Sequence, residues 1–194
     1  MPQAPDWLTV TQVIEFLLKG DYFRPKEPIT TLMPNNMNKL NGIGLDAAQS
    51  QQLAQQLNDL LANYSTFYQN VRGYHWKIRG EKFFELHLKF EELYNNLFVK
   101  IDEVAERILT LGFEPRHKYT EYLGTSEIKE TDETRDGLKA MEEILGAFKI
   151  LLIKQRQILN LAGEVGDEGT NALMSDYIRE QEKLVWMYSA YLNK

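Results

Sequence analysis

The sequence predicts an all-α protein, a bundle of four long helices joined by two short links and one long middle connection. Apolar residues recur at helical spacing in four segments, at about residues 46–74, 82–111, 131–162 and 168–192. Helices of this length span roughly 45 Å. The connection at residues 112–130 is long enough to cross that distance or to carry a short helix near residues 118–123. One core shared by the four helices follows.

Capping and helix-breaking residues mark where the predicted helices begin and end. Gly112 and Pro115 stop the second helix. Gly163 and Gly166 end the third helix, and Asp167 caps the fourth. The second and third helices are therefore separated by the long connection, and the third and fourth by a tight turn. This order, with one crossover, is the ferritin-like connectivity of a four-helix bundle.

Residues 1–44 are expected to be an N-terminal extension, and residues 45–194 the bundle domain. Asp6 is a candidate cap for a short amphipathic helix that ends at Gly20. Three prolines then favour an extended or irregular path: Pro25, Pro28 and Pro34. We expect this helical extension to dock on its own or a neighbouring subunit, with Met37 as an alternative start of the chain.

Composition excludes several classes of function. The absence of cysteine excludes disulfides, zinc–thiolate sites, iron–sulfur clusters and thiol nucleophiles, and predicts a reducing, cytoplasmic location. The net charge of −6 disfavours general attraction to nucleic acid or anionic membranes and suits attraction of cations. No segment is apolar enough to span a membrane, and the N-terminus lacks the basic segment of a secretory signal.

A stripe of metal-ligand side chains runs along the second predicted helix. His87 and Glu91 are four residues apart, and so are Asp102 and Glu106. The step from Glu91 to Asp102 turns about 1100°, only about 20° from whole turns, so all four side chains point roughly the same way. Tyr94 and Phe98 lie between them on the same stripe, which is otherwise apolar. Carboxylates on an apolar face are costly to bury unless paired or bound to metal. Imidazole with carboxylate suits iron, manganese or zinc.

One helix cannot bring both pairs to the same metal ion. Glu91 and Asp102 are separated by roughly 16 Å of helix rise, and His87 and Glu106 by more. A shared site requires a second copy of the helix running antiparallel, so that the His87 end of one meets the Asp102 end of the other. The sequence therefore predicts a two-fold dimer with metal at its interface.

A metal site inside the bundle core is not expected. Such a site in ferritin-like proteins needs Glu-x-x-His on two helices and a further Glu on each of the others. Glu114 and His117 match that spacing once, but Gly112 and Pro115 place them in a loop, where we expect His117 to be solvated. The third and fourth predicted helices contain no histidine.

The ligand pattern resembles the ferroxidase signature of the Dps family (DNA-binding proteins from starved cells, or mini-ferritins). The family's pattern is His-Trp, then a histidine with an acidic residue four later, then Asp with Glu four later. This chain fills every position, with His75-Trp76, His87, Glu91, Asp102 and Glu106. The phrases DEVAERILTLG and EKLVWMYSAYL also look like the family's second and fourth helices. The resemblance covers about residues 45–192.

The resemblance implies an iron-storing ferroxidase. It implies a homo-oligomeric, dodecameric cage that oxidises Fe(II) with hydrogen peroxide or O2, holds the ferric (Fe3+) mineral inside, and protects the cell from oxidative damage. His75, His87 and Glu91 would come from one chain, and Asp102 and Glu106 from its partner. Glu91 stands where the family usually has Asp, which puts occupancy of the second iron in question.

Several alternatives stay open. Trp76 is hypothesised to intercept stray oxidising equivalents, and otherwise is a packing aromatic at a helix end. The histidines could be structural, and Asp102 and Glu106 a solvated face. The protein could instead be a DNA-binding nucleoid protein, but this requires basic surface, and a Lys/Arg-rich tail is absent, so weak or no DNA binding is expected. A third alternative is a helical scaffold with inactive metal sites.

Overall fold

The computed structural model describes residues 39–132 and 134–194. Most of the expected extension, including its amphipathic helix, lies outside the described residues, so the boundary between residues 1–44 and 45–194 stays a prediction. Within the described ranges the fold is all-helical, without strands, as predicted. The helices are α2 (Ala47–Lys77), α3 (Phe83–Thr110), α4 (Tyr119–Thr125), α5 (Gly137–Val165) and α6 (Glu168–Tyr191).

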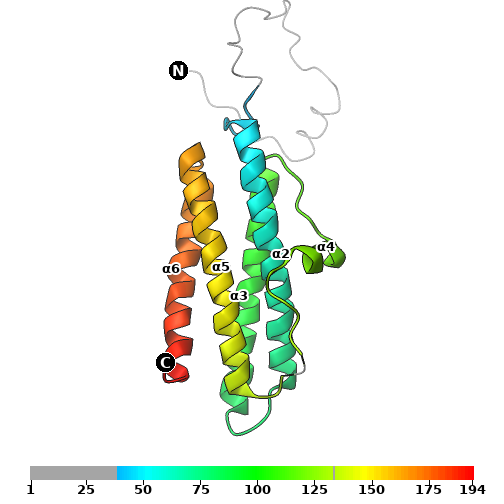
Figure 1. The fold of residues 1–194 in the computed structure, drawn as a ribbon, viewed down its shortest axis with the longest axis vertical. Coiled ribbons are helices and arrows are strands. Elements are labelled where there is room, and N and C mark those ends of the chain that lie inside the picture. The colour runs from blue at the N-terminus through cyan, green and yellow to red at the C-terminus, as the bar shows by residue number, and fades with distance from the viewer. Residues whose placement is uncertain (1–38, 133) are drawn as a thin grey trace, which may run out of the picture. The chain divides into compact units, whose positions relative to one another are not determined.

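The four long helices form two antiparallel hairpins, and the long connection carries the chain from one to the other. Helix α2 packs along α3 and also along α5, which pairs with α6. Because the chain returns past α4 before α5 begins, α3 and α5 run in the same direction (Figure 1). This is the ferritin-like four-helix connectivity predicted from the sequence, with the short helix α4 in the crossover.

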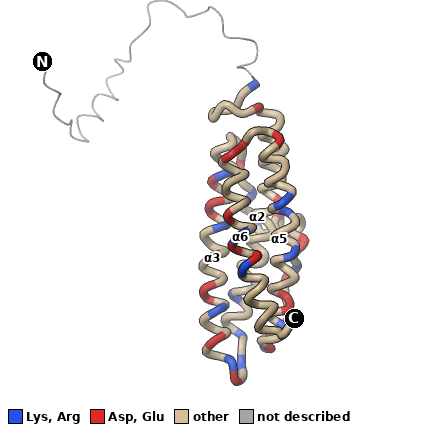
Figure 2. The backbone as a smooth tube through the Cα atoms, turned by 90° about the vertical axis from the view of Figure 1, so that its left-hand side faces the viewer, with Lys and Arg blue, Asp and Glu red and all other residues tan. Residues whose placement is uncertain are grey.

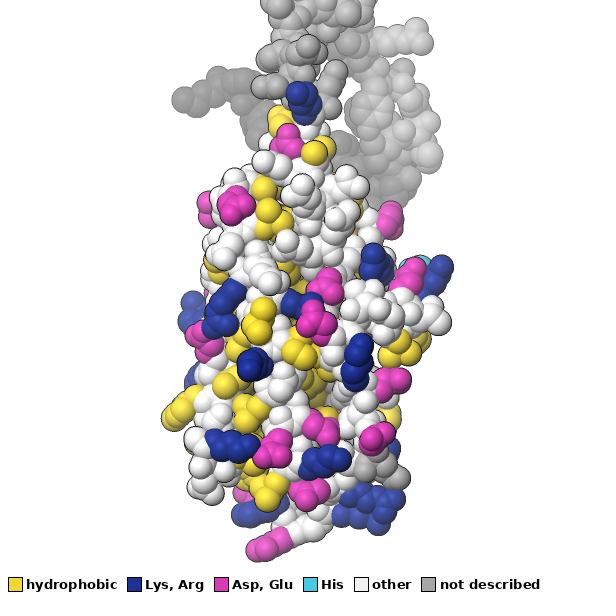
Figure 3. Space-filling view, in the orientation of Figure 1, with side chains coloured by type: hydrophobic (Ala, Val, Ile, Leu, Met, Phe, Trp, Pro, Cys, Tyr) yellow, Lys and Arg dark blue, Asp and Glu magenta, His cyan; other side chains and the backbone are white. Residues whose placement is uncertain are grey.

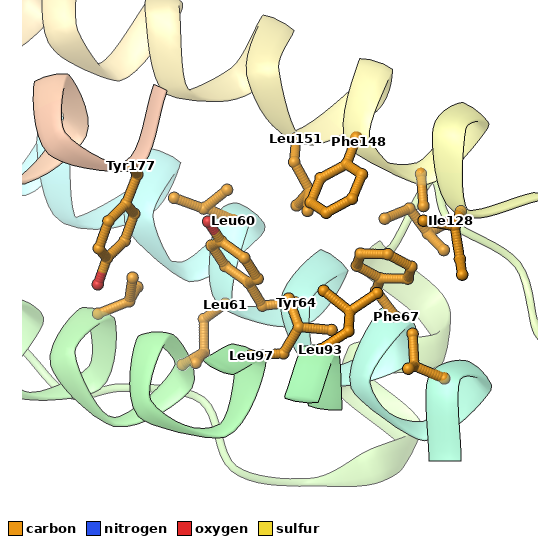
Figure 4. Close-up of a cluster of buried hydrophobic side chains, with 14 of the residues drawn as sticks. Leu60, Leu61, Tyr64, Phe67, Leu93, Leu97, Ile128, Phe148, Leu151 and Tyr177 are labelled. Atoms are coloured by element: carbon orange, nitrogen blue, oxygen red, sulfur yellow. The ribbon is translucent and has the colours of Figure 1, made fainter. Parts of the chain in front are cut away.

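The core lies between the two hairpins and is built of large aliphatic and aromatic side chains. Figure 4 shows Phe67 of α2 meeting Phe148 of α5, and their ring centroids lie 5.4 Å apart at 80°. Edge-to-face pairs of this kind add about 0.5–1.5 kcal/mol to the burial of their area. The same view shows side chains from all four long helices and the crossover: Leu60, Leu61, Leu93, Leu97, Ile128, Leu151 and Tyr177.

A neutral polar cluster sits inside this core. The Tyr64 hydroxyl accepts hydrogen bonds from Gln155 Nε2 at 2.7 Å and from Gln181 Nε2. Gln155 Nε2 also donates to Gln181 Oε1 at 2.9 Å, and all three residues are fully buried. Burial raises the pKa of Tyr64 far above its usual range, so the phenol stays neutral. Among the described residues the one buried carboxylate is Asp167, at the start of α6. The core thus lacks the acidic ligands of a bundle-centre metal site.

Three asparagines of α2 hold the crossover in place. The Asn58 side chain bonds the backbone at Glu114 and Arg116. Asn63 Oδ1 accepts from the backbone N–H groups of Glu127 and Ile128, at 3.0 and 3.1 Å. Asn70 bonds the backbone of Lys129 and Thr131 further along α2. These side chains satisfy the loop's polar backbone, which could not otherwise lie against the bundle without cost.

Helix α5 differs from expectation at both ends. It begins at Gly137 rather than near Thr131, because the Asp136 carboxylate caps it by accepting from the next free N–H groups. The prediction that Gly163 takes part in ending α5 is wrong, because Gly163 lies within the helix. The helix ends at Gly166, whose φ of 72° is the left-handed conformation that glycine adopts without strain.

Asp167 caps α6 and joins it to α3. Its carboxylate accepts from the Thr170 backbone N–H at 3.0 Å and from the Thr170 hydroxyl at 2.6 Å. Arg107 of α3 pairs with the same carboxylate, and its Nε donates to the Thr170 hydroxyl at 2.8 Å. The end of α3 is therefore fixed to the start of α6 by a buried ion pair.

Charges of both signs are interspersed over the described surface. Lysines and arginines alternate with aspartates and glutamates along the helices in Figure 2, and the face seen in Figure 3 shows the same mixture. None of the helices in the described part of the chain combines the length and apolarity needed to cross a bilayer.

Candidate metal centre

The short link between α2 and α3 brings His75 and His87 together. Helix α2 continues to Lys77, so His75 and Trp76 lie in its last turn, and His87 lies near the start of α3. The two imidazole rings are stacked, with centroids 3.8 Å apart and planes 19° from parallel. Two of the residues that the family resemblance assigns to one chain therefore lie in contact, while their role as metal ligands stays a prediction.

Reciprocal backbone hydrogen bonds orient the two imidazoles. His75 Nδ1 lies 2.8 Å from the His87 carbonyl oxygen, and His87 Nδ1 lies 2.9 Å from that of His75. Because a carbonyl oxygen only accepts, Nδ1 must carry the proton in both rings. The neutral rings then keep a lone pair on Nε2, which is the form that binds metal. Each Nδ1–H is engaged by a backbone carbonyl, so the pair presents two Nε2 lone pairs.

Neighbouring aromatic rings enclose the histidine stack. Phe83 stacks on His87 with centroids 5.0 Å apart and an interplanar angle of 23°. Tyr94 meets His75 edge-on, with centroids 5.3 Å apart at 80°. Both histidines are half-buried. Rings packed in this way leave the imidazoles little freedom to rotate away from the bonded orientation.

Glu91 lies one turn beyond His87 on α3 and is half-buried. The Tyr94 hydroxyl donates a long hydrogen bond of 3.4 Å to Glu91 Oε1. Lost hydration and the nearby Glu91 charge both raise the pKa of Tyr94, so its hydroxyl keeps its proton. Sequence reasoning placed Tyr94 on the ligand stripe but did not give it this contact, although its position three residues after Glu91 makes it reachable on a helix.

Asp102 and Glu106 lie further along α3 and are exposed to solvent. No three His, Cys, Asp or Glu side chains are grouped as a metal site within the chain described here. The structure therefore brings the two histidines together, leaves Glu91 one turn beyond His87 without forming a three-residue cluster in the described chain, and holds Asp102 and Glu106 further along α3.

Trp76 stands on the same face of α2 as Arg72 and Tyr68. It is 58% exposed, so it is not a core residue of its own chain. The Arg72 guanidinium lies over the Trp76 ring at 4.7 Å and over the Tyr68 ring at 5.3 Å. Sequence reasoning missed the contacts of Arg72 with the Tyr68 and Trp76 rings. The spacing of four residues between Tyr68, Arg72 and Trp76 was a signal for them, because residues four apart are neighbours on a helix. His117 is exposed in the loop before α4, as predicted.

Comparisons with known proteins agree with this fold. A ferritin-like domain model matches residues 54–194. A protein of Haemophilus influenzae is 55% identical over 148 residues, covering 76% of this chain and 92% of the relative. The Porphyromonas gingivalis "DNA protection during starvation protein" is 44% identical over 151 residues, covering 78% of this chain and 95% of the relative.

A solved structure is similar over nearly the whole described part. It is a Dps protein from Vibrio cholerae O1, described as a member of a broad superfamily of ferritin-like diiron-carboxylate proteins. The match has a TM-score of 0.79 at 58% identity and covers 84% of this chain and 99% of that one. The fold, the domain match and these relatives together show that the chain belongs to the Dps family of ferritin-like proteins.

Proposed function

We propose that the protein stores iron and oxidises Fe(II) at sites shared between two subunits. His75, His87 and Glu91 of one chain bind the Fe(II) substrate together with Asp102 and Glu106 of a second chain. Ferric mineral is held inside a dodecameric cage, which removes free Fe(II) and hydrogen peroxide from solution.

The observation that carries this proposal is the reciprocal bonding of the two histidines. Each Nδ1 is committed to a backbone carbonyl, so each Nε2 is free to bind a metal ion. Among the described residues neither Nε2 has a protein hydrogen-bond partner, which leaves both nitrogens available to a metal ion. Imidazole nitrogen beside the Glu91 carboxylate is a ligand set that suits iron, and additional carboxylates stabilise its ferric state.

The unpartnered face of α3 supports completion of the site by a second chain. Apolar side chains on the ligand stripe are open to solvent in the single chain: Phe84 at 83%, Phe98 at 60% and Leu109 at 52% exposed. An antiparallel copy of α3 packed on this face would cover them and bring Asp102 of one chain toward His87 of the other. One two-fold interface then builds two equivalent sites.

The ligand chemistry suits a two-electron reduction of hydrogen peroxide. Two Fe(II) ions held close together each give one electron to one peroxide, and two protons complete two waters. No hydroxyl radical is released when both electrons arrive together. Glu91 is one methylene longer than the family's usual Asp, so we expect the second iron to be held more weakly than the first.

The name of the Porphyromonas relative refers to DNA, but iron chemistry is the better-supported function here. Phosphate binding requires clustered Lys and Arg side chains. This chain carries a net charge of −6, and both signs are mixed over its described surface. The paired histidines, in contrast, have no role in binding a phosphate backbone.

Subunit mixing tests the shared site directly. One variant carries His75→Ala and His87→Ala, and the other carries Asp102→Ala and Glu106→Ala. Each alone should lose the fast rise in ferric absorbance when peroxide follows anaerobic Fe(II). After dissociation and co-assembly, half of the dimers are mixed and each mixed dimer has one intact site, so about one quarter of the sites should recover.

Two controls make the mixing result decisive. Simple mixing without dissociation should restore nothing, because subunits do not exchange. Co-assembly of wild type with the double-histidine variant gives particles in which only some sites are intact. Their ferric absorbance shows how large a partial recovery should be. No recovery after co-assembly, in particles whose mass matches the wild type, would show that each site is not divided in this way between two chains.

A further inference from the structure

Tyr94 is an oxidisable aromatic residue that contacts two of the proposed iron ligands. It meets His75 edge-on at 5.3 Å, and its hydroxyl donates to Glu91 at 3.4 Å. Trp76, by contrast, follows His75 in sequence but is 58% exposed, and its ring faces the Arg72 guanidinium. The neighbour of His75 in the sequence is therefore Trp76, whereas the residue that contacts the proposed ligands His75 and Glu91 in space is Tyr94.

A second tyrosine lies directly behind Tyr94. The Tyr68 ring of α2 is 6.2 Å from the Tyr94 ring, at 82°. Contact at this range allows an electron to pass between the two rings. The pair spans from α3 to α2, and both side chains are half-buried. A radical on either ring is thereby partly sheltered from solvent.

The position of Arg72 bears on which aromatic gives up an electron most readily. Its guanidinium lies 4.7 Å from the Trp76 ring centre and 5.3 Å from that of Tyr68. A cation over a ring is attracted to the ring's electrons and opposes their removal. Arg72 also acts on Tyr94, but less strongly than the Glu91 carboxylate beside the Tyr94 hydroxyl. The local charges favour oxidation of Tyr94 over oxidation of Trp76.

We propose that Tyr94, backed by Tyr68, supplies the second electron when only one iron is bound at the site. This rests on the proposed ferroxidase function and extends it to the half-loaded site that the longer Glu91 side chain favours. One Fe(II) gives one electron to hydrogen peroxide, which yields Fe(III), hydroxide and a hydroxyl radical. Tyr94 gives this radical a hydrogen atom, which forms water and a neutral tyrosyl radical.

The cycle closes with a second Fe(II). This ion gives one electron to the tyrosyl radical, a proton from water restores the phenol, and the ion becomes Fe(III). The sum is two Fe(II) and one hydrogen peroxide converted into two Fe(III) and two hydroxide ions, because the water formed in one step gives its proton in the next. Tyr94 thus keeps the stoichiometry of the doubly loaded site and prevents escape of the hydroxyl radical, while Tyr68, whose ring lies under the Arg72 guanidinium, is harder to oxidise and leaves most of the radical on Tyr94.

The test uses assembled protein loaded anaerobically with one Fe(II) per site and then given peroxide. Three quantities are measured in the same sample: ferric absorbance, the electron paramagnetic resonance signal of freeze-quenched protein, and spin-trapped hydroxyl radical per iron oxidised. Wild type should show a tyrosyl signal. Tyr94→Phe should lose that signal and release more trapped radical per iron, and Tyr68→Phe should keep a signal of altered shape.

Tyr119→Phe is the matched control, because Tyr119 and Tyr122 form a similar ring pair on α4, with centroids 6.4 Å apart at 84°. It should leave all three quantities unchanged. Trp76→Phe should leave the tyrosyl signal in place. A tyrosyl signal that survives Tyr94→Phe, or that disappears in Trp76→Phe, would overturn the assignment of Tyr94. Absence of ferric absorbance in wild type would instead overturn the proposed function itself.

Discussion

At the scale of single residues, hydrogen-bond partners decide what an ionisable side chain does. The same principle acts at Asp167 and at the histidine pair. Burial alone would disfavour a charged Asp167, but hydrogen bonds from Arg107 and Thr170 outweigh burial and lower its pKa. For His75 and His87 a backbone carbonyl accepts a hydrogen bond from Nδ1–H, which leaves Nε2 as the nitrogen that would bind a metal under the proposed function.

Asp167→Asn should destabilise the fold at neutral pH by about 1–3 kcal/mol, because a buried ion pair loses its anion. A carboxyl whose pKa is lowered on folding contributes stability above its unfolded pKa of about 3.9, and this contribution disappears as pH falls through the folded pKa. The gap between wild type and variant should therefore narrow below about pH 4. Urea unfolding at matched protein concentration measures both effects.

Asp176→Asn is the control for that prediction. Asp176 is on the same helix and also pairs with an arginine, Arg179, but both side chains are largely exposed. Exposed pairs contribute little because water and salt screen them. An equal loss of stability in both variants would contradict a specific role for the buried pair.

The sequence allowed the candidate ligand residues to be named, but not their geometry. Spacing alone placed His87, Glu91, Asp102 and Glu106 on one stripe, because helix periodicity is a local property. The Nδ1–carbonyl exchange depends on how closely the end of α2 approaches α3, which is a tertiary distance. The contact of Tyr94 with His75 likewise joins two helices, so no pattern within α3 predicts it.

At the scale of elements, helices were predicted well where both ends carry local signals and poorly where a distant side chain intervenes. Helix α3 matched to within one residue at each end, between the link after α2 and Gly112. Residues 131–132 and 134–135 were expected to be helical and are not. Asn70 of α2 holds the backbone of Thr131 in the loop, a contact that local propensity cannot reveal.

At the end of α5, replacement of two nearby glycines by alanine should change the stability of the protein in opposite directions. Gly166 has φ of 72°, so Gly166→Ala should cost about 1–2 kcal/mol through strain. Gly163 is helical, and an added Cβ would lie 3.6 Å from Asn171 Nδ2, an ordinary contact. Gly163→Ala should therefore stabilise the protein by about 0.5–1 kcal/mol.

Thermal unfolding of the two glycine variants, followed by circular dichroism at one protein concentration, measures this difference. Both substitutions add the same methyl group within one turn of the chain, so each serves as the other's control. Destabilisation by Gly163→Ala as large as that by Gly166→Ala would mean that α5 ends at the earlier glycine.

At the scale of the whole molecule, surface charge and an uncovered helix face point to self-association rather than to nucleic acid. The described surface mixes both signs, and the chain is acidic overall. The ligand stripe of α3, by contrast, carries large exposed apolar side chains, including Phe84 and Phe98. Its natural complement is another copy of the same helix.

We expect no tight complex with double-stranded DNA at neutral pH and moderate salt, because too few clustered cations are present to displace the counterions. A gel-shift titration across salt concentrations measures this. The assembled protein is compared with a variant that carries added lysines at its N-terminus, which should bind at low salt and release with increasing salt. Salt-resistant complexes of the unmodified protein would show a specific DNA site.

The distance between Glu91 and Asp102 along α3, roughly 16 Å of helix rise, also matters for a newly synthesised chain. Under the proposed arrangement such a chain carries two half-sites and no complete one, and no metal-ligand cluster exists within its described part. Free subunits therefore cannot run peroxide chemistry in the open, where its products would be harmful. Under the same proposal, oxidation begins only once two subunits have met, so assembly would confine the formation of ferric mineral to the finished particle.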